Sequence, residues 1–186
     1  MSVPIRIRTP LTAKDVERLR AGDKVLLSGI IYVARDAAHE RLVQELEKGN
    51  RLPFDLRGQT IYYMGPSPAP PGRVIGSAGP TTASRMDGFT PRLLAAGVRA
   101  MIGKGKRSTE VKEAIKRRQA VYFAAVGGVA ALLSKCITQS ETVAYADLGP
   151  EAVLKLSVTD FPVIVVNDLH GGDLLEQGKA KYQRGK

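Results

Sequence analysis

The sequence predicts a single α/β domain that spans residues 1–186. Short apolar stretches of β composition alternate with stretches in which apolar residues recur at helical spacing, which is typical of a domain built around a partly parallel sheet. Neither an internal repeat nor a low-complexity linker divides the chain. Because 186 residues can bury a core of ordinary size, we expect one compact domain.

Five elements are expected in the first third of the chain. In order, they are a strand at 5–8, a helix at 12–20, a buried strand at 25–34, a helix at 36–48 and a strand at 60–64. Isoleucine alternates with arginine in the first strand, and Ala21-Gly22 ends the first helix because glycine favours a helix C-terminus. In the second helix Ala38, Leu42 and Leu46 follow helical spacing.

Residues 65–80 are so rich in proline and glycine that they predict a long loop, and such loops are often functional. The helix that follows is interrupted by Gly88 and Pro91. The elements beyond the loop are a helix at 82–96, a strand at 98–102, a basic helix at 108–118, a strand at 120–126 and a helix from Gly127-Gly128 to Ile137. The β composition returns at 143–145, 153–158 and 163–166.

The composition is that of a soluble globular protein with 44% hydrophobic and 25% charged residues. A net charge of +10 favours a negative partner, whether nucleic acid, acidic membrane, small anion or acidic protein, and part of it fits a solvated surface. The basic residues of the C-terminal tail fit a solvated surface: Lys179, Lys181, Arg184 and Lys186. The N-terminus has no apolar signal region and no run reaches the roughly 18 apolar residues that span a bilayer, so we expect a cytoplasmic protein.

Cys136 is the only cysteine of the sequence. One thiol can form no intramolecular disulfide and cannot supply the ligands of a zinc site or an iron–sulfur cluster, so any cluster must come from elsewhere. Cys136 follows an apolar helical pattern at 130–133. This setting favours a buried structural thiol over a nucleophile.

The first candidate site is residues 79–87, Gly-Pro-Thr-Thr-Ala-Ser-Arg-Met-Asp. Glycine and proline shape a turn before a predicted helix, where backbone amides and the positive helix end favour a carboxylate or phosphate. Arg85, four residues after Thr81, would project from the same side of the first turn. The alternative is an ordinary threonine cap beside a surface arginine.

The second candidate site is Lys104, which lies between Gly103 and Gly105 where a strand ends, just before a helix that Ser108 could cap. Ligands of open α/β sheets collect at the carboxyl ends of strands, and glycine lets a backbone approach closely. The spacing is not that of a Walker A motif. The alternative is a basic turn without a ligand.

The third candidate site is the strand-to-helix junction at residues 34–39. Asp36 is suited to cap the helix and Arg35 could point at a ligand, although this segment taken alone favours a surface arginine. We expect His39 to cover the surface of the helix. The second histidine, His170, has the neighbours of a turn residue.

A set of motifs extends across these segments. They are Ala34-Arg35-Asp36-x-Ala38-His39, Ile61-Tyr62-Tyr63-x-Gly65-Pro66, Gly79-Pro80-Thr81-Thr82-Ala83-x-Arg85-Met86-Asp87, Lys104-Gly105-x-Arg107-Ser108, Gly127-Gly128 and Asp160-Phe161-Pro162. From about Val25 to Leu175 the chain resembles the C-terminal domain of class I fumarases and the β subunit of L-tartrate dehydratase. The Gly-Pro-Thr-Thr segment is highly specific in the company of the others.

The resemblance implies a fold, a partner and a cofactor. The fold is a swivelling β/β/α domain that closes over a larger partner. That partner, a separate α subunit, would carry a [4Fe-4S] cluster through three cysteines, so a hetero-oligomer is implied. The reaction would interconvert a hydroxy dicarboxylic acid and its dehydrated product, either malate and fumarate or tartrate and oxaloacetate.

The resemblance also assigns residues, none of them a metal ligand. Arg35, Thr82, Arg85 and Lys104 would bind the substrate carboxylates, and Thr81 would be the catalytic acid or base. Arginine suits this task because its guanidinium group matches a carboxylate with two hydrogen bonds. Ser84 and Lys106 depart from the glycine and asparagine of many fumarases, which bears on substrate identity.

Two other functions compete with this one. A nucleic-acid-binding module would use the basic cluster Lys112, Lys116, Arg117 and Arg118. Aromatic residues are only 5% of the chain and no recognised nucleic-acid motif is present, so this function is disfavoured. A non-catalytic regulator could keep the fold, but the presence of Thr81, Arg85 and Lys104 argues against it.

Overall fold

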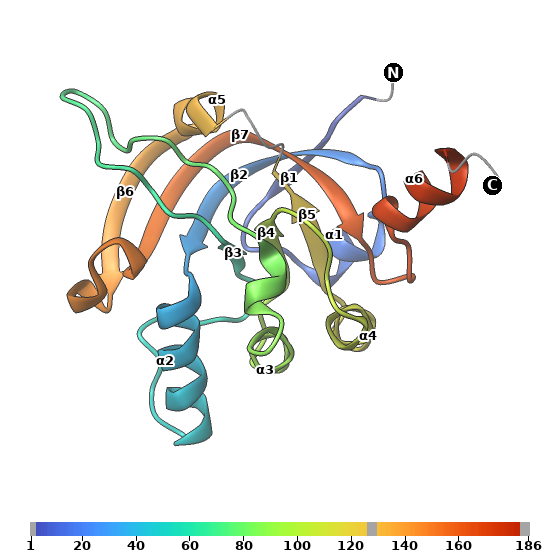
Figure 1. Cartoon of the computed structure of the whole chain (residues 1–186), viewed down its shortest axis with the longest axis horizontal. Coiled ribbons are helices and arrows are strands. Elements are labelled where there is room, and N and C mark those ends of the chain that lie inside the picture. Colours follow the sequence, from blue (N-terminus) through green and yellow to red (C-terminus); the bar gives the residue numbers. More distant parts are fainter. Residues whose placement is uncertain (1–2, 126–129, 183–186) are drawn as a thin grey trace.

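The structure, a computed structural model, describes residues 3–125 and 130–182 (Figure 1). The strands are β1 (Ile5–Arg8), β2 (Lys24–Val33), β3 (Thr60–Tyr62), β4 (Ala100–Gly103), β5 (Val121–Ala124), β6 (Ile137–Ala144) and β7 (Val153–Asn167). They form one sheet in the order β1-β2-β3-β4-β5-β7-β6. The α/β class predicted from the sequence is confirmed.

The sheet closes on itself through its two longest strands. The strands β2, β3, β4 and β5 are parallel neighbours, and β7 runs antiparallel to both β5 and β2. Figure 1 shows β2 and β7 as long, curved strands side by side. The bend of β2 includes a register shift at Leu27/Gly29. Gly29 has a φ of +117° and a Cβ there would lie 2.6 Å from Thr9 Oγ1, so only glycine fits this crossing.

The helices of the described chain are α1 (Ala13–Glu17), α2 (Asp36–Glu47), α3 (Thr90–Ala95), α4 (Thr109–Arg117), α5 (Ala130–Lys135) and α6 (Leu174–Tyr182), with 3₁₀ helices η1 (Ala83–Met86) and η2 (Ala146–Glu151). In Figure 1, α2, α3 and α4 lie together on one side of the sheet. Alternate residues of β3, β4 and β5 face two different hydrophobic cores. Tyr62 and Phe123 belong to the core shared with β7, whereas Ile61 and Tyr122 pack with the residues of these helices.

The order of most elements agrees with the sequence prediction, and several boundaries differ. The helix predicted at 82–96 is wrong as one element, because η1 and α3 are separate pieces with a turn at residues 87–89. Ile137 begins β6 and does not end a helix. The two strands predicted at 153–158 and 163–166 are one strand, in which Asp160 adopts a positive φ. The helix α6 was not predicted.

The predictions for Gly127-Gly128, Arg184 and Lys186 fall outside the described residues. Lys179 and Lys181 lie on α6, where Lys179 pairs with Glu176. Among the helices of the described chain, none combines the length and the apolar character that crossing a bilayer requires.

Candidate active site

Segments far apart in sequence meet at the carboxyl edge of the parallel strands. Arg35 follows β2, Tyr63 follows β3 and Lys104 follows β4. Because β2, β3 and β4 are parallel, these positions share one edge of the sheet. The end of the long loop returns to this edge as residues 80–83, where it bridges Met64 on one side and Lys104 on the other. The backbone of the three candidate segments therefore lies at one edge of the sheet.

Thr81 is held between two strand ends by backbone hydrogen bonds. Its N–H donates to Tyr63 O at 2.8 Å, and its carbonyl accepts from Lys104 N at 3.1 Å. Ala83 N then donates to Lys104 O at 2.9 Å. Gly103 permits this docking, because a Cβ there would lie 2.9 Å from Tyr63 Cδ2 and 3.0 Å from Ala83 Cβ. The glycine at position 103 thus lets residues 81–83 approach β4 closely.

The hydroxyl group of Thr81 donates to the carbonyl of Tyr63 at 3.1 Å, which leaves its lone pairs free to accept. Thr81 is half-buried and Thr82 is exposed. Thr82 is the N-cap residue of η1 but its side chain makes no capping hydrogen bond, so the threonine-cap alternative is wrong. A helix does begin at Ala83, close to the predicted start, but it is a 3₁₀ helix of four residues that ends at Met86.

Arg35 is the most enclosed of the candidate cations, with 21% of its side chain exposed. Its Nη2 lies 3.4 Å from Glu151 Oε1 and 3.9 Å from Asp36 Oδ2. The guanidinium group also lies against Gly65, where a Cβ would come within 2.5 Å of Nη1. An arginine so placed has little freedom to turn away from the edge of the sheet.

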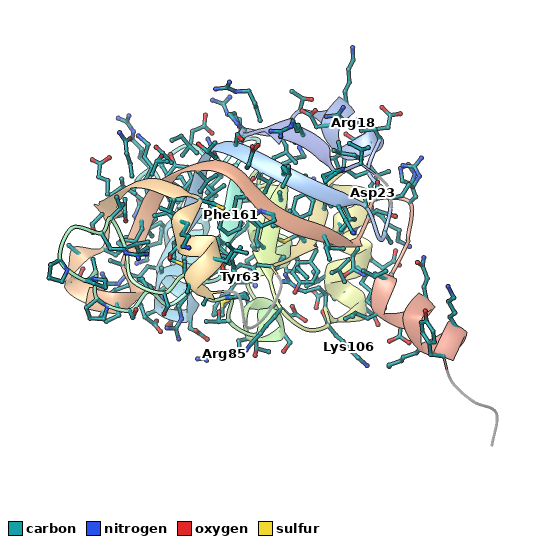
Figure 2. The ribbon with its side chains drawn as sticks, turned by 90° about the horizontal axis from the view of Figure 1, so that it is seen from above. Arg18, Asp23, Tyr63, Arg85, Lys106 and Phe161 are labelled. Atoms are coloured by element: carbon teal, nitrogen blue, oxygen red, sulfur yellow. The ribbon has the colours of Figure 1, made fainter. Side chains whose placement is uncertain are left out.

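Arg85 is more open, with 54% of its side chain exposed, and Figure 2 shows it at the surface while Tyr63 lies inside. Its Nε donates to Asp36 Oδ1 at 3.0 Å. Asp36 is therefore an acceptor for Arg85 and not the predicted cap of α2. The capping role falls to Glu151, 114 positions from Ala37 in sequence, whose Oε2 accepts the Ala37 N–H at 2.9 Å.

Lys104 has an exposed side chain at the end of β4, and within residues 3–125 and 130–182 it forms no ion pair. Its neighbour Lys106 lies 3.7 Å from Glu176 on α6. Ser108 caps α4 as predicted, since its Oγ accepts the N–H of Val111 at 3.3 Å. The amino group of Lys104 is thus available to an anion from outside the chain.

Sequence reasoning missed a buried ion pair beneath the site. The side chain of Arg107 is fully buried and its Nε donates to Asp87 Oδ1 at 2.7 Å. Its Nη1 donates to Tyr63 Oη at 3.2 Å and its Nη2 to Thr90 Oγ1 at 2.6 Å, while its guanidinium carbon lies 5.3 Å from the Tyr63 ring. Asp87 also accepts the N–H of Ser108 at 2.7 Å. The pair joins the segment of Arg85 to that of Lys104, and both residues stood in the family motifs.

His39 is fully buried, so the prediction that it covers the helix surface is wrong. Its Nδ1 lies 2.8 Å from Arg35 O, and because a carbonyl can only accept, the neutral ring carries its proton on Nδ1. Burial lowers the pKa of His39 to about 4, against the opposing effect of this hydrogen bond. The histidine packs edge-on against Tyr63 at 5.3 Å. His170 lies in a turn, as predicted.

The residues of this chain do not fit an iron–sulfur cluster. Cys136 is its only cysteine, and it is half-buried just after α5, where burial raises the pKa of its thiol. Across the described residues, no group of three or more His, Cys, Asp or Glu side chains is placed to hold a metal ion. A thiolate ligand set for a cluster therefore has no source in this sequence.

The fold and the site define an α/β domain that presents cations beside a threonine at the carboxyl edge of a parallel sheet. The chain belongs to the fumarase C-terminus family, whose model matches residues 1–178. It is similar to a putative L(+)-tartrate dehydratase subunit beta of Methanocaldococcus jannaschii, with 40% identity over 181 residues, which cover 94% of this chain and 93% of the relative.

Longer relatives are also similar. The aerobic class I fumarate hydratase of Salmonella typhimurium is 40% identical over 180 residues, which are 95% of this chain and 31% of that protein. Fumarate hydratase 2 of Leishmania major is 37% identical over 177 residues, or 93% of this chain and 31% of the relative. The chain spans about a third of the length of these fumarate hydratases.

Proposed function

We propose that this chain is the β subunit of an iron–sulfur hydro-lyase that interconverts a hydroxy dicarboxylic acid and its dehydrated product. The observation that carries the proposal is that Arg35 and Lys104 follow parallel strands at the sheet edge where the Thr81 backbone is bound, while Arg85 is joined to that edge through Asp36. Relatives named fumarate hydratase and tartrate dehydratase support the reaction class, and the relative that is matched over 93% of its length, named putative subunit beta, supports the subunit role.

The cations would bind the two carboxylates of the substrate. Arg35 is held in place by Glu151 and Gly65, so it offers a fixed point, whereas Arg85 and Lys104 are exposed and can meet a second group. Two carboxylates fixed at separate points orient the carbon between them, and orientation removes much of the entropic barrier. Thr82, exposed beside them, would add a hydroxyl donor to a carboxylate oxygen.

Thr81 would take up or return the proton at the substrate carbon. Its hydroxyl donates to a backbone carbonyl and presents lone pairs toward an incoming proton. An alkoxide is scarce at neutral pH, so the role requires stabilisation by nearby cations such as Lys104, whose backbone is hydrogen-bonded to that of Thr81. A positive field at this edge lowers the cost of negative charge on oxygen.

The partner would be a larger α subunit that holds the [4Fe-4S] cluster through its own cysteines. One cysteine cannot hold a cluster, which supports a second chain that carries it. Arg85 and Lys104 are also exposed, as expected if that chain completes the site. Malate and fumarate are the proposed pair, with tartrate and oxaloacetate as the alternative substrates.

Two of the four cations in the cluster named for the nucleic-acid alternative are neutralised within the described chain. Lys112 pairs with Asp173 and Lys116 with Glu113. These ion pairs reduce the uncompensated charge that phosphate groups would meet.

The test is co-expression of the full chain with a cysteine-bearing α subunit, anaerobic purification, and assays with fumarate, malate and tartrate. We expect turnover of at least one acid and a fall in kcat/KM of about 100-fold for Arg85→Ala, because an arginine–carboxylate contact is lost. Arg92→Ala is the matched control, since Arg92 is equally exposed and pairs with Glu47 on α2. Unchanged turnover in Arg85→Ala would overturn the substrate-binding assignment.

The same preparation tests Thr81. Thr81→Val removes the hydroxyl at constant shape, and we expect kcat to fall by about 100-fold or more with little change in KM. Thr138→Val is the control, because Thr138 also donates to a backbone carbonyl, that of Ser157, but lies on β6. Equal kcat values for the two variants would contradict the catalytic role.

A further inference from the structure

We propose that Asp36 is a positioning residue that orients the guanidinium group of Arg85 toward a substrate carboxylate. The inference rests on the proposed function and adds to it a residue that does not itself touch the substrate. Asp36 is the first residue of α2, and Arg85 lies in η1, 49 positions away in sequence. The contact therefore joins two elements that meet only in the folded chain.

The hydrogen bond between Asp36 and Arg85 decides which N–H donors of Arg85 remain available to a substrate carboxylate. Arginine has five N–H donors, and a carboxylate can bind it through Nε with one Nη or through the two Nη atoms. Asp36 Oδ1 occupies the Nε donor at 3.0 Å. The binding mode that uses Nε is therefore unavailable, and the two Nη atoms are the edge that meets a substrate carboxylate.

The carboxylate of Asp36 also lies between two cations. Its Oδ2 is 3.9 Å from Arg35 Nη2, while its Oδ1 accepts from Arg85. Arg35 is held by Glu151 and by the backbone of Gly65, so it stays in place without Asp36. Arg85, with 54% of its side chain exposed, has no comparable enclosure. Removing the negative charge would let two guanidinium groups repel and turn Arg85 toward solvent.

The arrangement assigns different tasks to two arginines with similar chemistry. Arg35 is a fixed anchor, and Arg85 is an adjustable one whose direction depends on Asp36. A dicarboxylate that spans them is selected by the distance between the anchors, so the aspartate would affect selectivity for dicarboxylates over monocarboxylates.

The first experiment detects the hydrogen bond between Arg85 and Asp36 and requires no enzyme activity. Nitrogen-15 NMR of the arginine Nε–H groups in the full chain should show the Arg85 signal protected from exchange, and Asp36→Ala should abolish that protection. Asp55→Ala is the matched control, because Asp55 accepts the Nε–H of Arg57 at 3.0 Å on the loop before β3. Asp55→Ala should leave the Arg85 signal unchanged.

The second experiment titrates succinate, a dicarboxylate that cannot be dehydrated, into the full chain and into its complex with the α subunit. We expect Asp36→Ala to weaken succinate binding about tenfold, to leave acetate binding within twofold, and to raise KM in the complex more than it lowers kcat. Asp36→Asn keeps an acceptor oxygen without the charge, so its effect should be about threefold. Asp55→Ala should match the wild type.

The outcomes separate the inference from the proposed function. If Asp36→Ala loses the protected Arg85 signal and binds succinate more weakly, the inference is supported, whether or not the complex turns over any acid. If no acid is turned over, the proposed reaction is wrong and the inference still holds. A protected Arg85 signal in Asp36→Ala, or unchanged succinate binding despite its loss, overturns the inference. An equal loss of acetate and succinate binding also overturns it, because general loss of charge would then be the cause.

Discussion

The guanidinium group of Arg35 lies against the backbone of Gly65, at the point where the long loop leaves β3. A methyl group on Gly65 would come within 2.5 Å of Nη1 and 3.4 Å of Cζ. The glycine of the Tyr-x-Gly-Pro motif is thus explained by a side chain 30 positions earlier in the sequence. A backbone approach this close is available only without a Cβ.

Gly65→Ala should displace the Arg35 guanidinium while the protein folds normally. The obstructing atoms are the far end of a flexible side chain, so the free energy of unfolding should change by less than about 1 kcal/mol. Succinate affinity and kcat/KM should fall about tenfold, because misplacement of a binding group by about 1 Å is costly. Urea unfolding and a succinate titration measure the two effects.

Gly178→Ala on α6 is the control, since a Cβ there meets no atom within 4 Å. It should leave succinate affinity unchanged. Large destabilisation by Gly65→Ala would show that the glycine serves the backbone and not Arg35.

Arg107→Met should destabilise the protein by about 3–5 kcal/mol. The substitution leaves the carboxylate of Asp87 without its ion-pair partner. This carboxylate is mostly buried, with 14% of the Asp87 side chain exposed. Arg107→Lys should lose less, but a single ammonium group cannot reach Asp87, Tyr63 and Thr90 at once. Urea unfolding at neutral pH provides the measurement.

Arg57→Met is the matched control for the buried pair, because Arg57 and Asp55 form an exposed ion pair on the surface. We expect it to leave the free energy of unfolding almost unchanged, because water screens an exposed ion pair. Similar losses in Arg57→Met and Arg107→Met would refute the energetic importance of burial.

His39 should make the protein less stable as pH falls from about 6.5 toward about 4. Burial lowers the pKa of the folded-state imidazole to about 4, while the unfolded chain binds a proton near 6.5. The unfolded state therefore holds more protons in this window, and the free energy of unfolding decreases by up to about 1.4 kcal/mol per pH unit.

The measurement compares urea unfolding at pH 7 and pH 5 for wild type and His39→Gln. The variant should lose about 2 kcal/mol less than the wild type between these pH values. Asp36 and Arg107 act on His39 with opposite signs, so both stay unchanged in the comparison. His170→Gln, which changes an exposed turn residue, should behave as the wild type does. An identical pH dependence for His39→Gln would contradict the account.

The position of the candidate residues could be predicted from local sequence because strand ends are local features. Aliphatic runs marked β2 and β4, and Arg35 and Lys104 lie just after these strands as predicted. That the two strand ends share one edge follows from the parallel pairing of β2, β3 and β4, which was not predicted from the sequence. The prediction at residues 82–96 failed because the turn at 87–89 depends on Asp87, which binds Arg107 and the N–H of Ser108. A helical pattern cannot report a partner some 20 positions away.

The sequence by itself determined the α/β class, the cationic strand ends and the absence of cluster cysteines, because periodicity and composition are read from neighbouring residues. Only the tertiary structure decided that Glu151 caps α2, that Asp36 holds Arg85 and that His39 and Arg107 are buried. These facts depend on contacts across the closed sheet and its helices. Burial and ion pairing are properties of distance in space, which a linear pattern does not contain.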